Sequence, residues 1–558
     1  MMLAKLNKIK KYFGDKLILD IQEFEVLEND RIGIVGDNGA GKTTMLNILM
    51  KNLETDEGQV FLTKSYSYIS QMENYYGNCE ENKVMKLFGS PDKYEDFLSG
   101  GEKIKLKISK ALSENKKLII ADEPTSNLDS KSIKILENML KGYKGAILLV
   151  SHDREFLDSL CTTIVEIDDG KIKVYKGNYS KYTELKREER KRKEIEHNEY
   201  INQKRKLENA IIGKQELRDS IKRTPKRMGN SEARLHRKMG GQRGKKNIDN
   251  NIKALKSRIN HLEVKEKPKT ISETKVNIQQ GVQIISKNTV EVKNLNLFAG
   301  NKLLIENAAF KVRRGKKVAI IGDNGCGKTT LLNAILKKDN ENIKIANKVN
   351  IGYFDQNQKI LLKEKSILEN VSENSSFDQS FIRINLDNFG FRGDEVFKFV
   401  SSLSGGEVVK VALCKVLLSD NNLLILDEPT NYLDIKAMEA LEKALINTGK
   451  TVIIVCHDRK FISNICDYII EIKDKCLIEF DGSYKKYLSE INKPKISKIE
   501  KANEEKLMIL KNKLTEVISL LSMERDVSKK DELEHEYNKV LKEIKVLERQ
   551  AILPIHIK

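Results

Sequence analysis

The chain has 558 residues, enough for about three to four domains, and its 39% of hydrophobic residues exclude a wholly disordered protein. A formal net charge of +19 suits an anionic partner such as nucleic acid or a membrane surface. The most apolar runs, 146–150 and 451–456, are strand-sized, so no membrane span is predicted. Seven cysteines without a CxxC pair and a lysine-interrupted N-terminus predict a reduced, cytoplasmic protein.

The first 180 residues begin with a glycine-rich loop, GDNGAGKTT at 36–44, between an apolar run at 32–35 and a helical pattern. A strand, such a loop and a helix together form a phosphate cradle, because backbone N–H groups and a lysine converge on the phosphates. Two threonines follow the lysine, and Thr43 is the expected Mg²⁺ ligand. The residues expected to hold the nucleotide here are Gly36, Asn38, Gly39, Gly41, Lys42, Thr43 and Thr44.

Two further apolar runs of this segment end in polar residues. The run at 118–121 precedes Asp122 and Glu123, which predicts a buried strand with carboxylates at its end. Asp122 is expected to hold Mg²⁺, and Glu123 to orient or deprotonate the attacking water. His152 follows the run at 147–150 and is predicted to contact the γ-phosphate. The alternative for Asp122 and Glu123 is a solvated strand end without a functional role, and the alternative for His152 is a structural histidine.

Residues 181–270 carry most of the net charge, with 28 Lys and Arg against 13 Asp and Glu. The composition up to about residue 220 favours a long helix. Ile248, Ile252, Leu255, Ile259 and Leu262 form the apolar seam of a second, antiparallel helix. Pro225, Gly229, Gly240, Gly241 and Gly244 are expected to break the helical pattern between them. This predicts a helical hairpin with a basic tip at 221–246, although a solvated charge run is the alternative.

Residues 271–490 repeat the motifs of the first segment in the same order, which predicts a tandem duplication. GDNGCGKTT recurs at 322–330, LSGGE at 98–102 recurs at 403–407, DEPT at 122–125 recurs at 427–430, and SHD at 151–153 recurs as CHD at 456–458. In this second copy Thr329 and Asp427 are expected to bind Mg²⁺, Glu428 to orient or deprotonate the attacking water, and His457 to contact the γ-phosphate. The residues expected to hold the nucleotide are Gly322, Asn324, Gly325, Gly327, Lys328, Thr329 and Thr330. The last segment, 491–558, has two heptad seams and is predicted to form a coiled-coil hairpin.

These motifs resemble those of the ATP-binding cassette family. The resemblance implies an α/β fold of two tandem P-loop NTPase cassettes, ATP and Mg²⁺ as cofactors, and ATP hydrolysis. It implies catalytic and Mg²⁺-binding roles for the Q-loop glutamines Gln71 and Gln356. In this family each ATP lies between one phosphate loop and the opposite LSGGE signature, so Lys42 is expected to face Ser404, Gly405 and Gly406, and Lys328 to face Ser99, Gly100 and Gly101. Tyr12 and Phe298 are candidates to stack on adenine, although Phe13 competes with Tyr12.

Tandem cassettes with a basic helical connector further resemble the ABC-F family, whose similar members bind the ribosome. Only 28 positions separate Gln71 from Ser99, against 48 between Gln356 and Ser404, so the extra arm of ABC-F translation factors has no room. This resembles the antibiotic-resistance, Vga-like group, which implies a monomer that protects the 50S subunit, with 23S rRNA and tRNA as partners. The expected RNA-binding residues are Lys222, Arg223, Lys226, Arg227, Met228, Asn230, Arg234, His236, Arg237, Lys238 and Arg243. A housekeeping translation factor and a transporter ATPase subunit are the alternatives.

Overall fold

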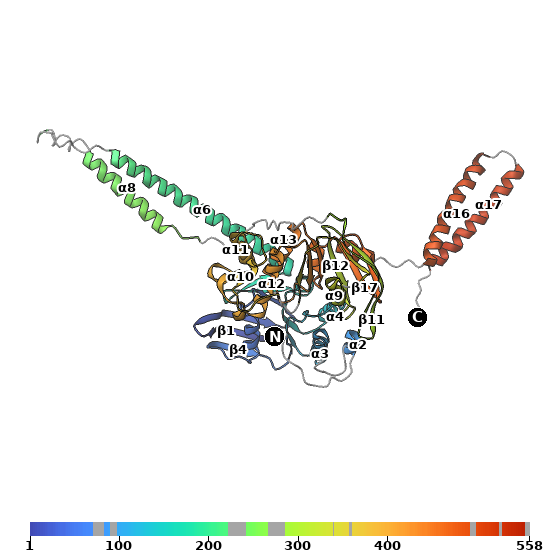
Figure 1. The fold of residues 1–558 in the computed structure, drawn as a ribbon, viewed down its shortest axis with the longest axis horizontal. Coiled ribbons are helices and arrows are strands. Elements are labelled where there is room, and N and C mark those ends of the chain that lie inside the picture. Colours follow the sequence, from blue (N-terminus) through green and yellow to red (C-terminus); the bar gives the residue numbers. More distant parts are fainter. Residues whose placement is uncertain are drawn as a thin grey trace. The chain divides into compact units, whose positions relative to one another are not determined.

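The computed structural model describes residues 1–70, 83–89, 98–220, 231, 241–265, 285–338, 340–355, 360–491, 498–523 and 527–552. The chain divides into two units, Met1–Tyr484 and Lys485–Lys558. The first unit contains two repeated α/β domains and the helices that connect them (Figure 1). The predicted fold of two tandem cassettes is therefore confirmed. In the described ranges no helix is long and apolar enough to cross a membrane.

The first cassette has two sheets. The smaller sheet is antiparallel, with the order β2 (Lys16–Leu27), β1 (Met2–Phe13) and β4 (Glu57–Leu62). The larger sheet has the order β5 (Tyr66–Ile69), β6 (Leu118–Asp122), β7 (Ala146–Val150), β3 (Arg31–Gly36), β8 (Thr163–Asp168) and β9 (Lys171–Lys176), parallel except for the β8–β9 pair. Its helices are α1 (Lys42–Leu49), α2 (Lys83–Phe88), α3 (Gly100–Ser113), α4 (Ser130–Lys141) and α5 (Arg154–Leu160). Apolar side chains on both faces of β6 and β7 bury this sheet between the antiparallel sheet with α1 and the helices α3, α4 and α5.

The second cassette repeats this arrangement. Its antiparallel sheet has the order β11 (Lys302–Arg313), β10 (Asn288–Ala299) and β13 (Ile343–Ile345). Its larger sheet has the order β14 (Ile351–Phe354), β15 (Leu423–Asp427), β16 (Thr451–Val455), β12 (Lys317–Gly322), β17 (Tyr468–Lys473) and β18 (Cys476–Phe480). The helical elements are α9 (Lys328–Lys337), α10 (Ile367–Ser372), α11 (Gln379–Asn388), η1 (Gly393–Phe397), η2 (Val400–Ser402), α12 (Gly405–Leu418), α13 (Ile435–Asn447) and α14 (Arg459–Ile465).

The strand order places the three motif types of each cassette at one sheet edge. In the first cassette β6, β7 and β3 are neighbours and run parallel, so their carboxyl ends meet. The phosphate loop follows β3, Asp122 and Glu123 end β6, and His152 follows β7. The neighbours β15, β16 and β12 repeat this in the second cassette. The carboxyl edge of a parallel sheet is where ligands bind in α/β folds.

The connector contains two long helices, α6 (Tyr179–Ser220) and α8 (Gly241–His261), which pack on each other. Ile252 of the predicted seam and Ile211 of α6 are buried between them, and His197 Nδ1 lies 2.7 Å from the Lys265 carbonyl oxygen. One sequence expectation is wrong, because Gly241 and Gly244 lie within α8. A glycine inside a helix lowers the stability of the helix by about 1 kcal/mol relative to alanine. The packing of the later turns of α8 on α6 offsets this loss.

The second unit, Lys485–Lys558, contains two long helices, α16 (Lys498–Met523) and α17 (Val527–Ile552), which pack on each other. Helix α15 (Tyr484–Ile491) starts at the boundary between the units. Val517 of one heptad seam and Val540 and Ile544 of the other are buried, and Leu541 is half-buried, whereas the other residues next to them along each helix are exposed. Lys513 and Glu536 form an ion pair of 2.8 Å between the two helices.

Candidate functional site

Each phosphate loop encloses its own lysine. Gly41 precedes α1 with a left-handed φ of 99°, and a Cβ at this position would lie only 2.8 Å from Leu19 Cδ2, so only glycine fits. Lys42 Nζ donates hydrogen bonds to the carbonyl oxygens of Gly36 (2.8 Å) and Asp37 (3.0 Å). The loop thus holds a buried ammonium group at the start of a helix, where backbone N–H groups attract phosphate.

The second loop has the same geometry. Lys328 Nζ donates to the carbonyl oxygens of Gly322 (2.9 Å) and Asp323 (3.1 Å), and Gly327 has a φ of 107°. The two loops therefore offer two matched phosphate sites.

A hydroxyl and a carboxyl group meet beside each lysine. Thr43 Oγ1 donates to Asp122 Oδ2 at 2.9 Å, and Thr329 forms the equivalent bond to Asp427. Burial raises the pKa of both aspartates, while these hydrogen bonds lower it. Asp427 Oδ1 is buried and has no hydrogen-bond partner among the described residues. These oxygen atoms fit Mg²⁺, which takes few protein ligands beside substrate phosphates.

The two glutamates after these aspartates lie in strained backbone. Glu123 and Glu428 both have a φ of 50°, a left-handed conformation that is uncommon for non-glycine residues. The N–H of Glu123 is held by the Val150 carbonyl at 2.9 Å, and that of Glu428 by the Val455 carbonyl at 2.8 Å. Because β6 and β15 end there, this geometry directs each carboxyl group to the sheet edge that carries the phosphate loop.

Each of these glutamates faces a histidine. His152 Nε2 lies 3.5 Å from Glu123 Oε1, and His457 Nε2 lies 3.3 Å from Glu428 Oε1. Burial raises the pKa of both glutamates to about 8. Burial, followed by the charge of the nearby lysine, lowers the pKa of both histidines to about 3. Each histidine is therefore a neutral imidazole at pH 7, and His152 Nδ1 and Glu123 Oε1 lack a hydrogen-bond partner within the described chain.

The two cassettes meet head to tail. Asn38 Nδ2 donates to the Tyr432 carbonyl, and Asn324 Nδ2 donates to the Asn127 carbonyl, both at 2.9 Å. A Cβ at Gly406 would lie 3.0 Å from Asn38 Nδ2, and one at Gly101 would lie 2.9 Å from Asn324 Nδ2. Each phosphate loop thus lies against the LSGGE signature of the other cassette, as the resemblance implied.

A cavity of about 1320 Å³ lies where the second phosphate loop faces the first signature. Among the predicted site residues, its walls contain Ser99, Gly100, Gly101, Glu123, His152, Asn324, Gly325, Gly327, Lys328, Thr329, Thr330, Glu428 and His457. The phosphate-binding and acidic groups of one cassette and the signature of the other therefore enclose a single space. Its walls combine apolar and polar groups, including the unpartnered Glu123 Oε1, and fit a nucleoside triphosphate with its cation.

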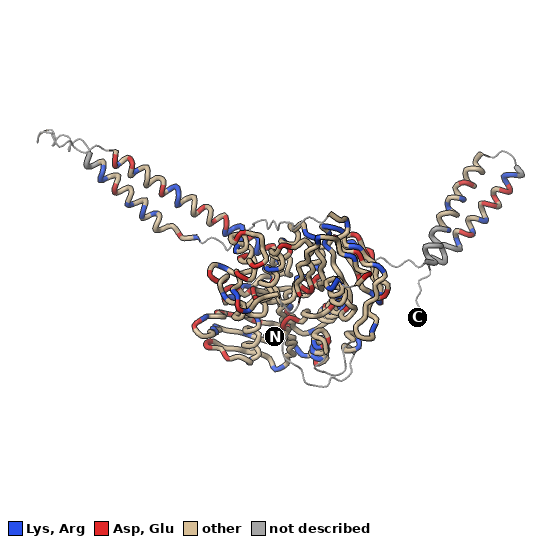
Figure 2. The backbone as a smooth tube through the Cα atoms, in the orientation of Figure 1, with Lys and Arg blue, Asp and Glu red and all other residues tan. Residues whose placement is uncertain are grey.

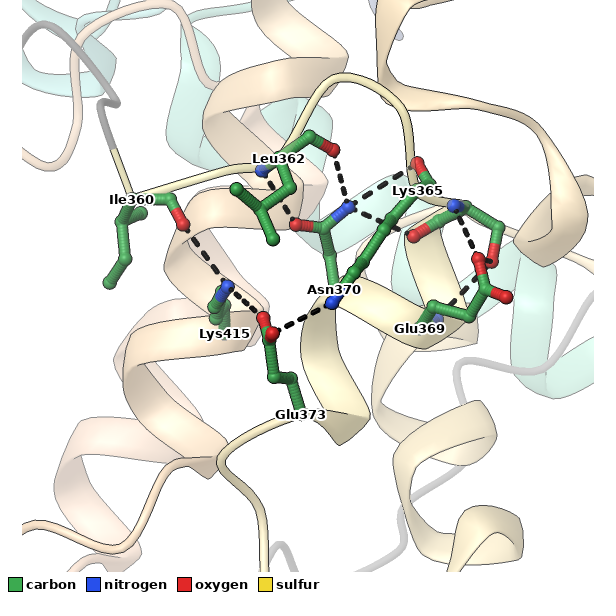
Figure 3. A network of polar contacts seen from close by, with 8 residues as sticks. Ile360, Leu362, Lys365, Glu369, Asn370, Glu373 and Lys415 are labelled. Carbon is green, nitrogen blue, oxygen red and sulfur yellow. Dashed lines mark hydrogen bonds and ion pairs between the residues drawn. The ribbon is translucent and has the colours of Figure 1, made fainter.

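The second signature is the start of α12, and a buried polar network fixes this helix (Figure 3). Lys415 Nζ donates to the Ile360 carbonyl and to Glu373, both at 3.1 Å. The fully buried Asn370 side chain accepts from the Leu362 N–H at 2.9 Å and donates to the Leu362 carbonyl at 2.9 Å. The segment that follows Gln356 in the chain is therefore bound to the helix that carries the signature.

Several predicted residues are not brought into this site. Gln71 and Gln356 lie outside the described residues, and so do the tip residues, except Arg243, which belongs to α8. Tyr12 and Phe298 are exposed, and the cavity wall contains Ala299, Lys302 and Leu304 instead of Phe298. Their roles remain predictions.

The structure also reveals contacts that the motifs did not suggest. Lys436 pairs with Asp37 at 2.7 Å across the cassettes, and Lys410 pairs with Asp434 beside the Asn38 loop. Asp434 and Asp129 also accept hydrogen bonds from the backbone N–H groups of Asn38 and Asn324. The repeat could have indicated the two aspartates, because both lie in matched positions after DEPT.

Comparisons with known proteins agree with this geometry. The sequence profile of the family described as ABC transporter matches residues 19–126 and 305–431. The chain is 31% identical to the ATP-binding protein Uup of Buchnera aphidicola, over 98% of this chain and 91% of that protein. It is also 31% identical to the ribosome protection protein VmlR of Bacillus subtilis, over 98% of this chain and 99% of that protein.

A solved structure shows the same fold. In the complex of the archaeal ribosomal stalk protein aP1 with the archaeal ribosome recycling factor aABCE1, a chain superposes with a TM-score of 0.59 at 20% identity, covering 87% of this chain and 92% of that one. Fold, site and comparisons define an ATP-binding cassette protein that hydrolyses ATP. The chain belongs to the ABC-F family of ATP-binding proteins.

Proposed function

We propose that this ATPase binds the ribosome and protects the 50S subunit from drugs of the peptidyl-transferase centre, of the lincosamide, pleuromutilin and streptogramin A types. ATP with Mg²⁺ holds the cassettes closed, and in this state the connector lies near the tRNA and the drug site. Hydrolysis then releases the protein. The observation that carries the proposal is the combination, in one chain, of two composite ATP sites with two packed, basic linker helices.

The residues of each ATP site have separate roles in binding and hydrolysis. Lys42 and Lys328 bind the β- and γ-phosphates, while Thr43 with Asp122, and Thr329 with Asp427, hold Mg²⁺, which neutralises phosphate charge when bound. Glu123 and Glu428 orient the water, and in their ionised form each accepts its proton; the raised pKa makes this carboxylate the stronger base. The neutral histidines donate a hydrogen bond toward the γ-phosphate. The opposite signature contributes helix N-terminal N–H groups at the same phosphate.

The connector supplies the surface for RNA. Helix α8 has six Lys and Arg residues and one Asp, and α6 has twelve basic and nine acidic residues. Figure 2 shows that basic residues recur along both helices. A stiff, basic hairpin can contact several phosphates of folded RNA at once. The similarity to a ribosome protection protein over nearly the whole chain supports this partner.

The test uses Glu123→Gln with Glu428→Gln, which keeps ATP binding and removes hydrolysis. We expect this double variant to sediment with 70S ribosomes in the presence of ATP, whereas the parent protein dissociates. The matched control adds Lys42→Ala and Lys328→Ala, which removes phosphate binding and should abolish sedimentation. A double variant that stays free of ribosomes with ATP present contradicts the proposal, and recovery with membranes favours a transporter subunit.

A housekeeping role in translation is the second candidate. It is favoured by the similarity to Uup, whose identity and coverage nearly equal those of VmlR. Both candidates require ribosome binding and the same ATP chemistry. They differ in whether the protein changes the susceptibility of a host to 50S drugs.

A further inference from the structure

An arginine follows the His-Asp pair of each cassette, at Arg154 and Arg459, 305 positions apart. The same offset relates Glu137 to Glu442. In the structure these four residues form crossed pairs, because Arg154 pairs with Glu442 and Arg459 lies 4.0 Å from Glu137. The pairs therefore join the two cassettes through α5 and α14, next to the histidines of both ATP sites.

The two crossed pairs differ in burial and in contact. Arg154 is 3% exposed, donates from Nη2 to Glu442 Oε1 and lies 3.9 Å from Asp458. Glu442 also accepts from Asn464 Nδ2 at 3.1 Å. Among the described residues Arg459 forms two longer ion pairs, 4.0 Å to Glu137 and 3.8 Å to Glu155, and 43% of the Glu155 side chain is exposed. The Arg154 contact is thus the stronger of the two.

Acidic groups crowd around Arg154 where the cassettes meet. Asp153 and Asp458 cap α5 and α14, accepting from the N–H groups of Phe156 (3.0 Å) and Phe461 (2.8 Å). Burial raises the pKa of Asp153, and burial together with the Asp153 charge raises the pKa of Asp458. Asp458 and Glu442 both lie beside Arg154, whereas the charge of Arg459 acts on Asp153. Without the Arg154 guanidinium, Asp458 and Glu442 would be buried where the cassettes meet without their main counter-charge.

The same cluster reaches the first turn of the linker helix. Tyr179, the first residue of α6, is 2% exposed, and Lys460 Nζ of the second cassette lies 5.8 Å from its ring centroid. Burial raises the pKa of the Tyr179 hydroxyl, the Glu439 and Glu442 charges raise it further, and the Arg154 charge lowers it. The start of the linker helix is therefore in electrostatic contact with both cassettes.

We propose that Arg154 is a positioning residue that latches the two cassettes in the closed state and transmits this state to the first turn of α6. The inference rests on the proposed cycle of closure. In the separated state Arg154 is no longer paired with Glu442, and Tyr179 no longer lies beside Lys460. The linker helix thus changes its surroundings at its start whenever ATP closes the cassettes.

The test measures closure in the full chain without ribosomes. Dyes on the two cassettes report closure by energy transfer in the Glu123→Gln/Glu428→Gln protein, and hydrogen exchange reports the amides of 179–186. We expect Arg154→Met to raise the ATP concentration at half-closure at least tenfold and to remove the ATP-induced protection of 179–186. Adding Glu442→Gln should recover part of this loss, because it removes the unpaired carboxylate. Arg459→Met is the matched control, with a shift below about threefold, because its contacts to Glu137 and Glu155 are longer than the contact of Arg154 to Glu442.

Two results would overturn the proposal that Arg154 holds the cassettes in the closed state. One is closure of Arg154→Met at the same ATP concentration as its parent. The other is a loss of thermal stability without ATP that accounts for the weaker closure, which would make Arg154 a folding residue only. Ribosome binding is not part of this measurement. If the double glutamine protein closes but does not sediment with ribosomes, the proposed function fails and the latch stands.

Discussion

The carboxyl groups of Glu123 and Glu428 lie where a charge is costly unless it has a partner. Each is held beside a neutral imidazole and near a phosphate-loop lysine, and burial raises its pKa to about 8. Such a group binds a proton more tightly in the folded protein than in the unfolded chain, where a glutamate has a pKa of about 4.3. The folded state therefore loses stability as pH rises through this interval.

We expect Glu123→Gln with Glu428→Gln to stabilise the nucleotide-free protein in a pH-dependent way. At pH values near the unfolded pKa of about 4.3, the glutamates are protonated in the folded state and about half protonated in the unfolded chain, so their burial costs little stability. As pH rises from there to about 8, the unfolded state ionises first, so stability declines, and above the folded pKa the loss is complete. Glutamine does not titrate, so the melting temperature should rise by about 5 °C near pH ~8.5 and by less than about 1 °C near pH ~4.5.

Scanning calorimetry at the two pH values measures this difference. Glu306→Gln, at an exposed position, is the control and should change neither value. An equal gain at both pH values would show that packing rather than ionisation is responsible.

Most residues of the ATP sites could be predicted from the sequence, because each lies in a motif that occurs twice, and the phosphate loops, acidic pairs and histidines also follow apolar runs. Arg154 and Glu442 were missed, although they obey the same offset of 305. A charged residue on an amphipathic helix gives no local sign that it is buried. Its burial depends on a second cassette hundreds of residues away, which sequence patterns do not place.

At the scale of elements, the helix that carries a signature needs a fixed position, and buried polar contacts provide it for α12. Lys415 is 3% exposed and satisfies the Ile360 carbonyl and Glu373, while Asn370 satisfies both the N–H and the carbonyl of Leu362. Removing either side chain breaks at least two partly buried hydrogen bonds, each of which contributes about 0.5–1.5 kcal/mol.

We expect Lys415→Met to lower the free energy of unfolding by about 1–3 kcal/mol. Lys365→Met is a matched control in the same network, because 41% of the Lys365 side chain is exposed and its bond to Glu373 is a surface contact. It should cost less than about 0.5 kcal/mol. Urea unfolding of the three proteins measures both effects. If both variants lose the same free energy of unfolding, the hydrogen bond from Lys415 to the Ile360 carbonyl does not contribute to stability.

The linker helices show which features the apolar periodicity of a sequence can predict. Ile248, Ile252 and Leu255 predicted the packed face of α8, but Gly241 and Gly244 were expected to break the helix and do not. Glycine lowers helix stability only modestly, and tertiary packing decides in such cases. In contrast, the seam of α16 and α17 was predicted well, since a heptad repeat on both helices fixes which faces meet.

For the whole molecule, the net charge of +19 is concentrated on the connector rather than on the cassettes. Neutralising four lysines on α8, with Lys245→Gln, Lys246→Gln, Lys253→Gln and Lys256→Gln, should weaken ribosome binding. The slope of the logarithm of the binding constant against the logarithm of the salt concentration should decrease in magnitude by up to about 0.7–0.9 for each RNA phosphate that the connector no longer neutralises. The matched control places the same changes on α17, at Lys529, Lys530, Lys539 and Lys542, which are exposed. Sedimentation at several salt concentrations measures the slope, and ATP turnover without ribosomes should be equal in all proteins.

The same proteins decide between protection and housekeeping in a drug-sensitive host. We expect the parent chain and the α17 variant to raise the inhibitory concentration of at least one lincosamide, pleuromutilin or streptogramin A at least fourfold, and the α8 variant to raise it less. The reason is that protection requires the connector to stay near the drug site, which depends on its contacts to RNA phosphates. If the parent chain changes susceptibility to none of these drugs while still binding ribosomes, protection is wrong and the housekeeping role is supported. If the α8 and α17 variants protect equally, the basic face of α8 is not the RNA contact.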